Sequence, residues 1–194
     1  MRYSPEHKKQ AREKLLANGA GYAKQHGFSA SGVDALAAAA GVTSGSLYKN
    51  FSNKTELFAA LIDAELRKSV NVIAEVPAGD MVAFRTLLLR YLSLDHVEHP
   101  QAGCPIPALA AEVARVEEPV RRIFESGISD LVSLLEKWTG SRESAWALLC
   151  QSVGAVMVAR AFVDNDMRHE LLSAVREQSE RALFDLGPNG STRA

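Results

Sequence analysis

The sequence predicts an all-α protein, with an N-terminal helix-turn-helix domain of three helices followed by a larger C-terminal helical domain. Two observations predict this fold class. Apolar residues recur three and four positions apart along most of the chain, whereas almost no stretch alternates apolar and polar residues as a strand does. Glycines, prolines and N-capping side chains divide these stretches into about nine helices. The 194 residues, 47% of them hydrophobic, are enough for one large or two small domains.

Three segments follow from the positions of these breaks. We predict a helix-turn-helix domain over residues 1–52, a helical domain over residues 53–186, and a disordered tail over residues 187–194, whose sequence GPNGSTRA cannot form a core. The predicted helices of the second domain span about 54–74, 80–97, 106–115, 119–139, 142–164 and 167–186. The longest loop between them, residues 99–105, holds two prolines and a glycine.

The first domain opens with a helix from about Pro5, a favoured first-turn residue, to about His26. A second helix, about 32–40, is expected to begin at Ser31. Asp34 stands three residues further on, so the pair resembles a capping box, in which two side chains satisfy the free amides of a helix start.

A tight turn and a third helix complete this domain. Gly41 is expected to end the second helix in a conformation with positive φ, and Thr43 to cap a helix over about 44–51. Leu47 and Phe51 lie four residues apart, so they would bury one side of that helix, while its other side is small, polar or basic. Two short helices joined in this way form a helix-turn-helix, whose second helix can lie in the major groove of DNA.

These residues resemble the TetR family of bacterial transcriptional regulators. The matching segment is AAAAGVTSGSLYKNFSNKTELF, from Ala37 to Phe58, with its small-residue run before Gly41, its Leu47-Tyr48 pair and its acidic-apolar helix start after Lys54. The rest of the chain resembles the family's ligand-binding half only in length and helical pattern. The resemblance implies a DNA-binding protein that acts as a homodimer and responds to a small-molecule effector.

Eight residues are the predicted DNA contacts: Thr43, Ser44, Gly45, Ser46, Tyr48, Lys49, Asn50 and Lys54. Hydroxyl groups at the start of the helix can donate to phosphate, and Gly45 lets the backbone approach the groove. Lys49 is the only charge on the predicted recognition helix, so it is the candidate for a guanine contact. Asn50 can contact adenine or help to cap the helix. With few long side chains for base contacts, shape and backbone contacts are expected to carry much of the affinity.

The charge distribution supports a DNA-binding N-terminus. Residues 1–54 hold 8 Lys and Arg against 3 acids, a net charge of +5, whereas residues 55–194 hold 14 against 20, a net charge of −6. The whole chain carries only −1. A basic module on an acidic body is what DNA binding by one end requires, although solvated surface charge alone would give the same count.

The last two predicted helices are the candidate dimer interface. The helix from Ala145 is rich in small residues, which let helices approach closely, and the resemblance implies that both helices pair with their copies. Closing the protomer's own core is the alternative role. The predicted interface residues are Gly154, Ala155, Val158, Ala161, Leu172 and Val175.

The remaining helices hold most of the aromatic residues, and apolar pockets between helices are common ligand sites. The candidate effector pocket comprises Phe84, Leu88, Tyr91, Cys104, Phe124, Trp138 and Trp146, with an ordinary filled core as the alternative. An apolar or amphipathic effector is expected, because this part of the chain has no charged cluster. No cofactor is expected.

The two cysteines, Cys104 and Cys150, are too few and too far apart for a disulfide framework or a zinc motif. Cys104 lies near His96 and His99, so a reactive thiol is one interpretation and a buried structural cysteine is the other. The loose His-x-x-His spacing is a poor match to a metal site, and none is predicted.

The chain begins without the apolar segment of a signal peptide, and the apolar stretch 145–163 contains Gln151, Ser152 and Arg160. We therefore expect a cytoplasmic protein with no membrane partner. The expected function is a non-catalytic, ligand-responsive repressor that binds a palindromic DNA operator. A thiol-based redox or electrophile sensor acting through Cys104 is the alternative, and a helical cysteine-dependent enzyme is a weaker one. The operator, the regulated genes and the effector stay open.

Overall fold

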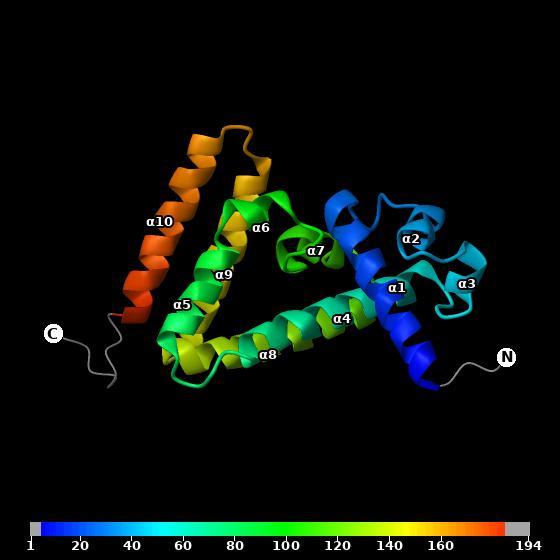
Figure 1. Cartoon of the computed structure of the whole chain (residues 1–194), viewed down its shortest axis with the longest axis horizontal. Coiled ribbons are helices and arrows are strands. Elements are labelled where there is room, and N and C mark those ends of the chain that lie inside the picture. The colour runs from blue at the N-terminus through cyan, green and yellow to red at the C-terminus, as the bar shows by residue number, and fades with distance from the viewer. Residues whose placement is uncertain (1–4, 185–194) are drawn as a thin grey trace. The chain divides into compact units, whose positions relative to one another are not determined.

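The computed structural model describes residues 5–184, which form ten α-helices and no strand, so the all-α prediction is confirmed (Figure 1). The helices are α1 (Pro5–His26), α2 (Val33–Ala39), α3 (Ser44–Tyr48), α4 (Lys54–Ala74), α5 (Met81–Tyr91), α6 (Leu94–Glu98), α7 (Ile106–Val113), α8 (Glu118–Thr139), α9 (Arg142–Ala161) and α10 (Asn165–Phe184). The predicted tail, residues 187–194, lies outside the described residues.

The described helices divide into two compact units. The first unit contains residues 5–67 and 100–126, and the second contains residues 68–99 and 127–184. The first unit therefore extends past the predicted boundary at residue 52 and takes in α7 from the middle of the chain. Helices α4 and α8 each begin in the first unit and end in the second.

In the first unit, α1 packs against α2 and α7, and α2 packs against α3. Figure 1 shows α2 and α3 at the N-terminal end of the colour scale, beside α1. The core of this unit includes Phe28 and Phe58, whose rings stack with their centroids 4.2 Å apart. Stacked aromatic rings add to the stability that burial of their apolar area provides.

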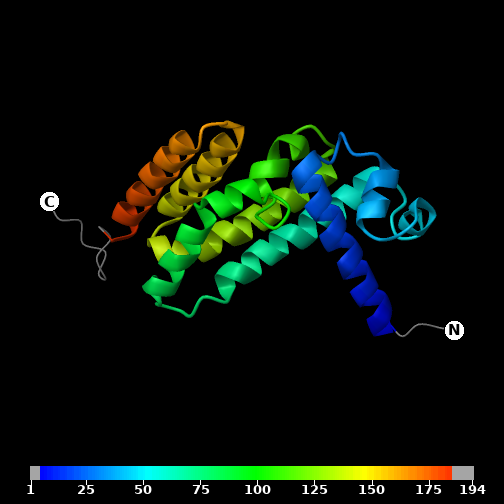
Figure 2. The same ribbon diagram turned by 45° about the horizontal axis from the view of Figure 1, so that its top comes forward.

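In the second unit, α9 and α10 form an antiparallel pair joined by a short turn, and they lie side by side in both ribbon views (Figures 1 and 2). Helix α6 packs on α9, and α5 contacts α6 and α10. Phe84 of α5 stacks on Trp138 of α8, with 4.6 Å between ring centroids and an interplanar angle of 3°.

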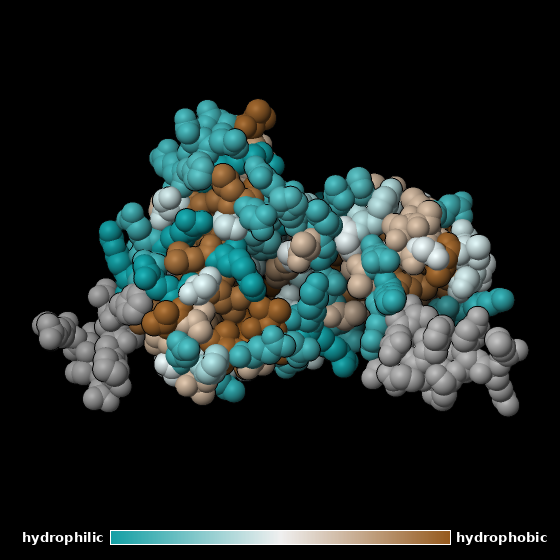
Figure 3. All heavy atoms as spheres, viewed as in Figure 1, coloured by the Kyte–Doolittle hydropathy of each residue, from teal (hydrophilic) through white to brown (hydrophobic). Residues whose placement is uncertain are grey.

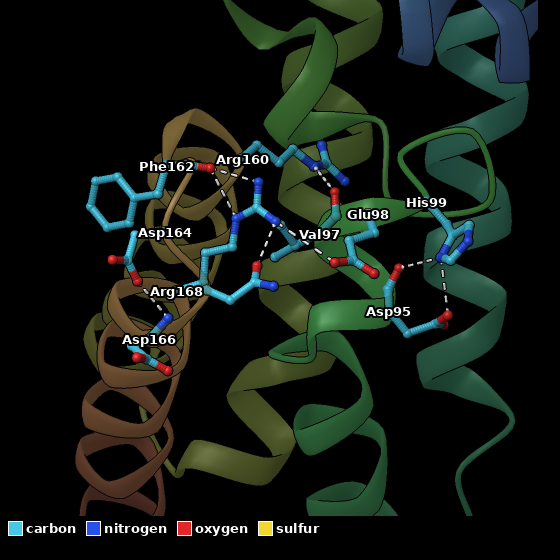
Figure 4. Close-up of polar contacts among 10 residues, drawn as sticks. Asp95, Val97, Glu98, His99, Arg160, Phe162, Asp164, Asp166 and Arg168 are labelled. Carbon is cyan, nitrogen blue, oxygen red and sulfur yellow. Dashed lines mark hydrogen bonds and ion pairs between the residues drawn. The ribbon is translucent and has the colours of Figure 1, made fainter.

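Arg160 ties α9 to α6, and Arg168 ties α10 to the turn that joins α9 and α10 (Figure 4). Arg160 donates hydrogen bonds to the carbonyls of His96 and Val97, at 3.0 and 3.3 Å. Arg168 donates to the Phe162 carbonyl, at 3.0 Å from Nε and 2.6 Å from Nη2. These bonds satisfy carbonyls at the ends of α6 and α9, which helical hydrogen bonds leave free.

The structure corrects three predicted helix bounds. The helix expected over about 80–97 is two helices, because Leu92 leaves the helical conformation and Ser93 caps α6, its Oγ accepting a hydrogen bond from the His96 amide at 3.2 Å. The described residues therefore contain ten helices and not nine. Helix α3 ends at Tyr48, short of the predicted residue 51, and α9 ends at Ala161, short of 164.

One predicted cap is wrong. Helix α2 has Gly32 at its N-cap and no side-chain cap. The Ser31 hydroxyl instead donates to the Gly27 carbonyl, and the Asp34 carboxylate accepts from the Ser44 hydroxyl. The predicted cap at Thr43 is confirmed, because its Oγ1 accepts from the Ser46 amide at 3.1 Å.

Candidate DNA-binding site

A glycine-terminated turn sets the angle between α2 and α3. Gly41 has a φ of +72°, as predicted. The Val42 amide donates to the Ala37 carbonyl and the Gly41 amide to the Ala38 carbonyl, each at 3.0 Å. This pair of bonds is a Schellman motif, in which the residue with positive φ ends a helix and turns the chain back. The turn therefore needs no residue from outside the segment.

Two buried side chains fix the orientation of α3. Leu47 and Phe51 are almost completely buried, as the four-residue spacing predicts. The Arg12 guanidinium lies 5.3 Å from the centroid of the Phe51 ring, a cation–π contact from α1. Because one side of α3 is held in this way, its opposite side must face outward.

Five of the eight predicted DNA contacts are exposed, namely Thr43, Gly45, Tyr48, Lys49 and Asn50, whereas Ser44 and Ser46 are partly buried and the Ser44 hydroxyl is bound to Asp34. Tyr48 is 50% exposed, and Gly45 has no atom within 4 Å of the position where a Cβ would stand. Lys49 is also exposed, but it forms the C-cap of α3 and is not inside the helix. Asn50 Nδ2 donates to the Ser46 carbonyl at 2.9 Å, which matches the capping role considered for it.

The eighth predicted contact, Lys54, is engaged within the protein. Its ammonium donates to the Ser29 carbonyl at 3.0 Å and lies 5.1 Å from the centroid of the Phe28 ring. It stands at the start of α4, where Asn53 caps the helix by accepting from the Glu56 amide at 2.8 Å. Lys54 therefore holds the turn between α1 and α2 in this structure.

The Glu56 carboxylate completes that helix start. It accepts a hydrogen bond from the Ser52 amide at 2.7 Å, and this bond, with a second from the Ser52 side chain, lowers the pKa of Glu56. Together with the Asn53 cap this arrangement resembles a capping box, except that Glu56 accepts from the amide of the residue before the cap.

Sequence reasoning missed two acidic residues that matter for this unit. Glu112 of α7 contacts the turn between α1 and α2, and Glu65 of α4 pairs with Lys24 of α1 at 2.5 Å. Glu65 carried a signal, because it falls in register with the apolar residues Leu61, Ile62 and Leu66 of α4. Glu112 carried none, since its partners are more than 80 residues away.

The structure distributes the seven predicted effector residues over both units. Phe84, Leu88, Tyr91, Trp138 and Trp146 belong to the second unit, whereas Cys104 and Phe124 belong to the first. Trp146 is 41% exposed on α9, so it lies at the surface of its unit and not in the core. Phe84 is buried and its stacked partner Trp138 is partly exposed. The hydroxyl of Ser152 is buried and has no hydrogen-bond partner in the described part of the chain.

The predicted dimer residues divide into two groups. Ala155 and Leu172 are buried within the second unit, at 4% and 1% exposure, where they pack in the protomer's own core, the alternative role considered for these helices. Val158 and Ala161 are exposed, and Gly154 and Val175 are partly exposed. Exposed Trp146 and Met157 extend the same apolar surface along α9.

Helix α9 is the one helix among residues 5–184 that is long and apolar enough to cross a membrane, a test that core helices of soluble proteins also pass. Only 33% of its apolar window is buried within the protomer. Apolar surface is also visible around α5 on the face drawn in Figure 3, among hydrophilic side chains. Within the same residues, no group of three or more His, Cys, Asp or Glu is placed to hold a metal ion.

The helix-turn-helix, with one side of its second helix buried and the other side open, defines a DNA-binding regulator. Residues 15–61 match the family model described as bacterial regulatory proteins, tetR family. This match covers the helix-turn-helix and parts of the helices on either side of it, so this part of the chain is similar to the DNA-binding segment of that family.

Solved structures match nearly the whole chain. E. coli NemR in its reduced form is 23% identical, covers 89% of this chain and 96% of its own, and has a TM-score of 0.72. A TetR transcriptional regulator from Legionella pneumophila is 16% identical, with coverages of 94% and 100% and a TM-score of 0.73. A TetR-family regulator from Streptomyces coelicolor is 23% identical, with coverages of 91% and 96% and a TM-score of 0.66. At these identities the likeness is one of fold. No curated protein sequence matches the chain.

Proposed function

We propose that the protein is a ligand-responsive repressor without catalytic activity, which binds a palindromic operator as a homodimer and releases it when a small apolar or amphipathic effector binds. The observation that carries this proposal is the open side of α3. Tyr48, Gly45 and Lys49 are exposed there, next to a buried anchor at Leu47. A half-exposed tyrosine beside a glycine and a lysine suits contact with a phosphate backbone and a groove edge.

Gel shifts on the promoter of this gene and of its neighbours, at two salt concentrations, test DNA binding. Lys49→Ala is expected to weaken specific binding by roughly 1–3 kcal/mol, the range for a bidentate base contact. Lys137→Ala is the matched control, because Lys137 is an exposed lysine on α8. Failure of the wild-type protein to shift any genomic fragment would refute the repressor function.

Dimerisation is supported by the exposed face of α9. Trp146, Met157 and Val158 are 41%, 52% and 42% exposed, and they recur on one side of the helix with the small residues Gly154 and Ala161. An apolar surface of this kind commonly marks a protein–protein interface. The two helix-turn-helix domains of a dimer that bind successive grooves on one face of DNA must be about 34–36 Å apart, or a multiple of that distance.

Helix α4 is the element that we expect to carry the effector signal, because it begins at the helix-turn-helix and ends in the second unit. A ligand in the second unit would tilt α4 and change the separation of the two helix-turn-helix domains in the dimer. DNA affinity would then fall without any change at a DNA-contacting residue. By linkage, operator DNA must weaken effector binding by the same factor. The unpaired Ser152 hydroxyl favours an effector that also offers one hydrogen-bonding group.

One observation favours a thiol-based sensor as the second candidate. One of the similar solved structures is the reduced form of E. coli NemR. In this chain Cys104 is half-buried and follows Gly103, whose carbonyl accepts a hydrogen bond from the buried Lys24 ammonium at 2.8 Å. A cation beside a thiol favours the thiolate, and the Glu65 carboxylate that pairs with Lys24 offsets part of that effect.

The two candidates differ in what releases the operator. Release by oxidants or electrophiles but not by apolar ligands, abolished by Cys104→Ser and retained in Cys150→Ser, would assign the signal to the thiol. Turnover of generic esters that is lost with Cys104→Ala would instead support the cysteine-dependent enzyme.

A further inference from the structure

We propose that Glu112 of α7 and Lys54 of α4 act together as positioning residues for DNA binding: they clamp the turn between α1 and α2 (residues 27–32) and so orient the helix-turn-helix that follows it. This inference rests on the proposed DNA-binding function. Neither residue has to touch DNA for it.

The Glu112 carboxylate holds the turn by its amides. One oxygen accepts from the Phe28 amide at 2.9 Å, and the other accepts from the Ser29 amide at 2.6 Å. Hydrogen bonds to an ionised acceptor are roughly twice as strong as neutral ones, and two of them on one carboxylate fix an orientation as well as a distance.

Lys54 holds the same turn by its carbonyl. Its ammonium donates to the Ser29 carbonyl at 3.0 Å and lies over the Phe28 ring, which in turn stacks on Phe58 of α4. Ser29 is therefore bound through its N–H by an anion from α7 and through its C=O by a cation from α4. Helix α2 begins four residues later, at Val33, so the clamp fixes the point from which the helix-turn-helix starts.

The backbone at Gly27 is adapted to this clamp. Gly27 has a φ of +81°, and a Cβ placed there would stand 3.2 Å from Glu112 Oε1. A side chain at this position would have to adopt a conformation that L residues rarely use and would crowd the carboxylate. Glycine satisfies both requirements at once.

The clamp gives Lys54 a role that differs measurably from a phosphate contact. A lysine that neutralises a phosphate contributes about one unit to the slope of log affinity against log salt. A lysine that only positions the helix-turn-helix contributes to affinity and leaves that slope unchanged. The two roles are separated by the salt dependence of the Lys54→Ala variant.

The test compares Glu112→Gln, Lys54→Ala and the double variant with wild type on operator DNA at several salt concentrations. Glu117→Gln is the matched control, because Glu117 is an exposed acid near the end of α7 whose side chain makes no hydrogen bond with the turn. Hydrogen exchange of the Phe28 and Ser29 amides without DNA reports the clamp directly, and thermal unfolding shows that each variant folds.

We expect Glu112→Gln to speed exchange at both backbone amides, because the glutamine side chain keeps only one of the two acceptor oxygens. Operator binding should weaken roughly tenfold, with an unchanged salt slope. Lys54→Ala should behave in the same way, and the double variant should lose less than the product of the two single losses, because both act on one turn. Glu117→Gln should match wild type.

Three results would overturn the inference. Faster amide exchange in Glu112→Gln with unchanged operator affinity would leave the clamp a purely structural feature. A salt slope reduced by one unit in Lys54→Ala, with independent losses in the double variant, would make Lys54 a phosphate contact. A wild-type protein that binds no operator would remove the proposed function itself, whereas unchanged amide exchange in Glu112→Gln, with operator binding by wild type intact, would remove only the clamp.

Discussion

Within the first unit, the largest effect on stability is expected from the buried ion pair between Lys24 and Glu65. The Lys24 side chain is 1% exposed and that of Glu65 is 6% exposed, with 2.5 Å between Nζ and Oε2. The ammonium also donates to the Gly103 carbonyl at 2.8 Å. One lysine thus joins α1 to α4 and to the segment that precedes α7.

Removing one partner should be far more damaging than removing both. Lys24→Met leaves a buried carboxylate without its cation, and breaking a buried pair in this way costs about 3–5 kcal/mol. That is a large share of the roughly 5–15 kcal/mol that holds a domain folded. At about 2–4 °C per kcal/mol for a chain of this size, the unfolding midpoint should fall by roughly 6–20 °C.

The double variant Lys24→Met with Glu65→Leu should recover most of that loss, because apolar residues of similar volume often replace a buried ion pair without net destabilisation. The Gly103 carbonyl still loses its donor, so recovery should stop about 1 kcal/mol short of wild type.

Urea unfolding, for the free energies, and thermal unfolding, for the midpoint temperatures, are followed by circular dichroism for wild type and both variants. Arg67→Ala is the control, because the Arg67–Asp63 pair is exposed, with side chains 76% and 45% accessible, and should contribute less than about 1 kcal/mol. A Lys24→Met variant that is no less stable than Arg67→Ala would contradict the reasoning, since the pair would then be solvated. A double variant as unstable as Lys24→Met would show that the lysine stabilises through packing and not through charge.

Three further predictions concern the second unit. Ser152→Ala should raise the free energy of unfolding by about 1 kcal/mol, because a buried hydroxyl without a hydrogen-bond partner is unfavourable, and thermal unfolding that shows a loss would mean that the hydroxyl is satisfied. Gly154→Arg should yield a folded monomer by light scattering, since nothing lies within 4 Å of its Cβ position in the protomer, and a dimeric variant would place the interface elsewhere. The Arg85 hydrogen bond lowers the pKa of Glu180, so this pair stabilises the fold above the ordinary glutamate pKa and ceases to do so as the pH falls through the lowered value. Glu180→Gln should therefore make acid unfolding slightly less steep, and an unchanged pH profile would show that the pair contributes nothing.

Most helices could be predicted because their boundaries depend on neighbouring residues. Helix α1 begins at Pro5 and ends before Gly27, and α4 spans Lys54–Ala74, as the breaks in the sequence indicate. The break between α5 and α6 was missed because no glycine or proline marks it. Leu92 is completely buried there, so tertiary packing ends the helix at a residue with good helical propensity.

In the candidate site, too, features set by neighbouring residues could be predicted and contacts between distant residues could not. Exposure of Tyr48 and burial of Leu47 follow from helical spacing within a few residues, so both were predicted. The partners of Lys54 were not, since a lysine at a helix start next to a DNA-binding motif has the same local pattern whether it meets phosphate or the protein. Its true neighbour, Ser29, lies 25 residues earlier.

The inside of the helix-turn-helix and its attachment to the first unit are held by different kinds of contact. The angle between α2 and α3 is set by the Gly41 turn and the Thr43 cap, which involve no residue outside the motif. The attachment of the motif to the rest of its unit combines buried apolar side chains such as Leu47 and Phe51 with a few charged groups, Glu112 and Lys54 at the turn and the Lys24–Glu65 pair behind it. Ionic and hydrogen-bonded contacts of this kind weaken steeply when their geometry changes, whereas a packed core resists deformation. Under the proposed effector response, a ligand that moves α4 or α7 would therefore shift the helix-turn-helix as an intact body, and DNA affinity would fall because of its position and not because of its fold.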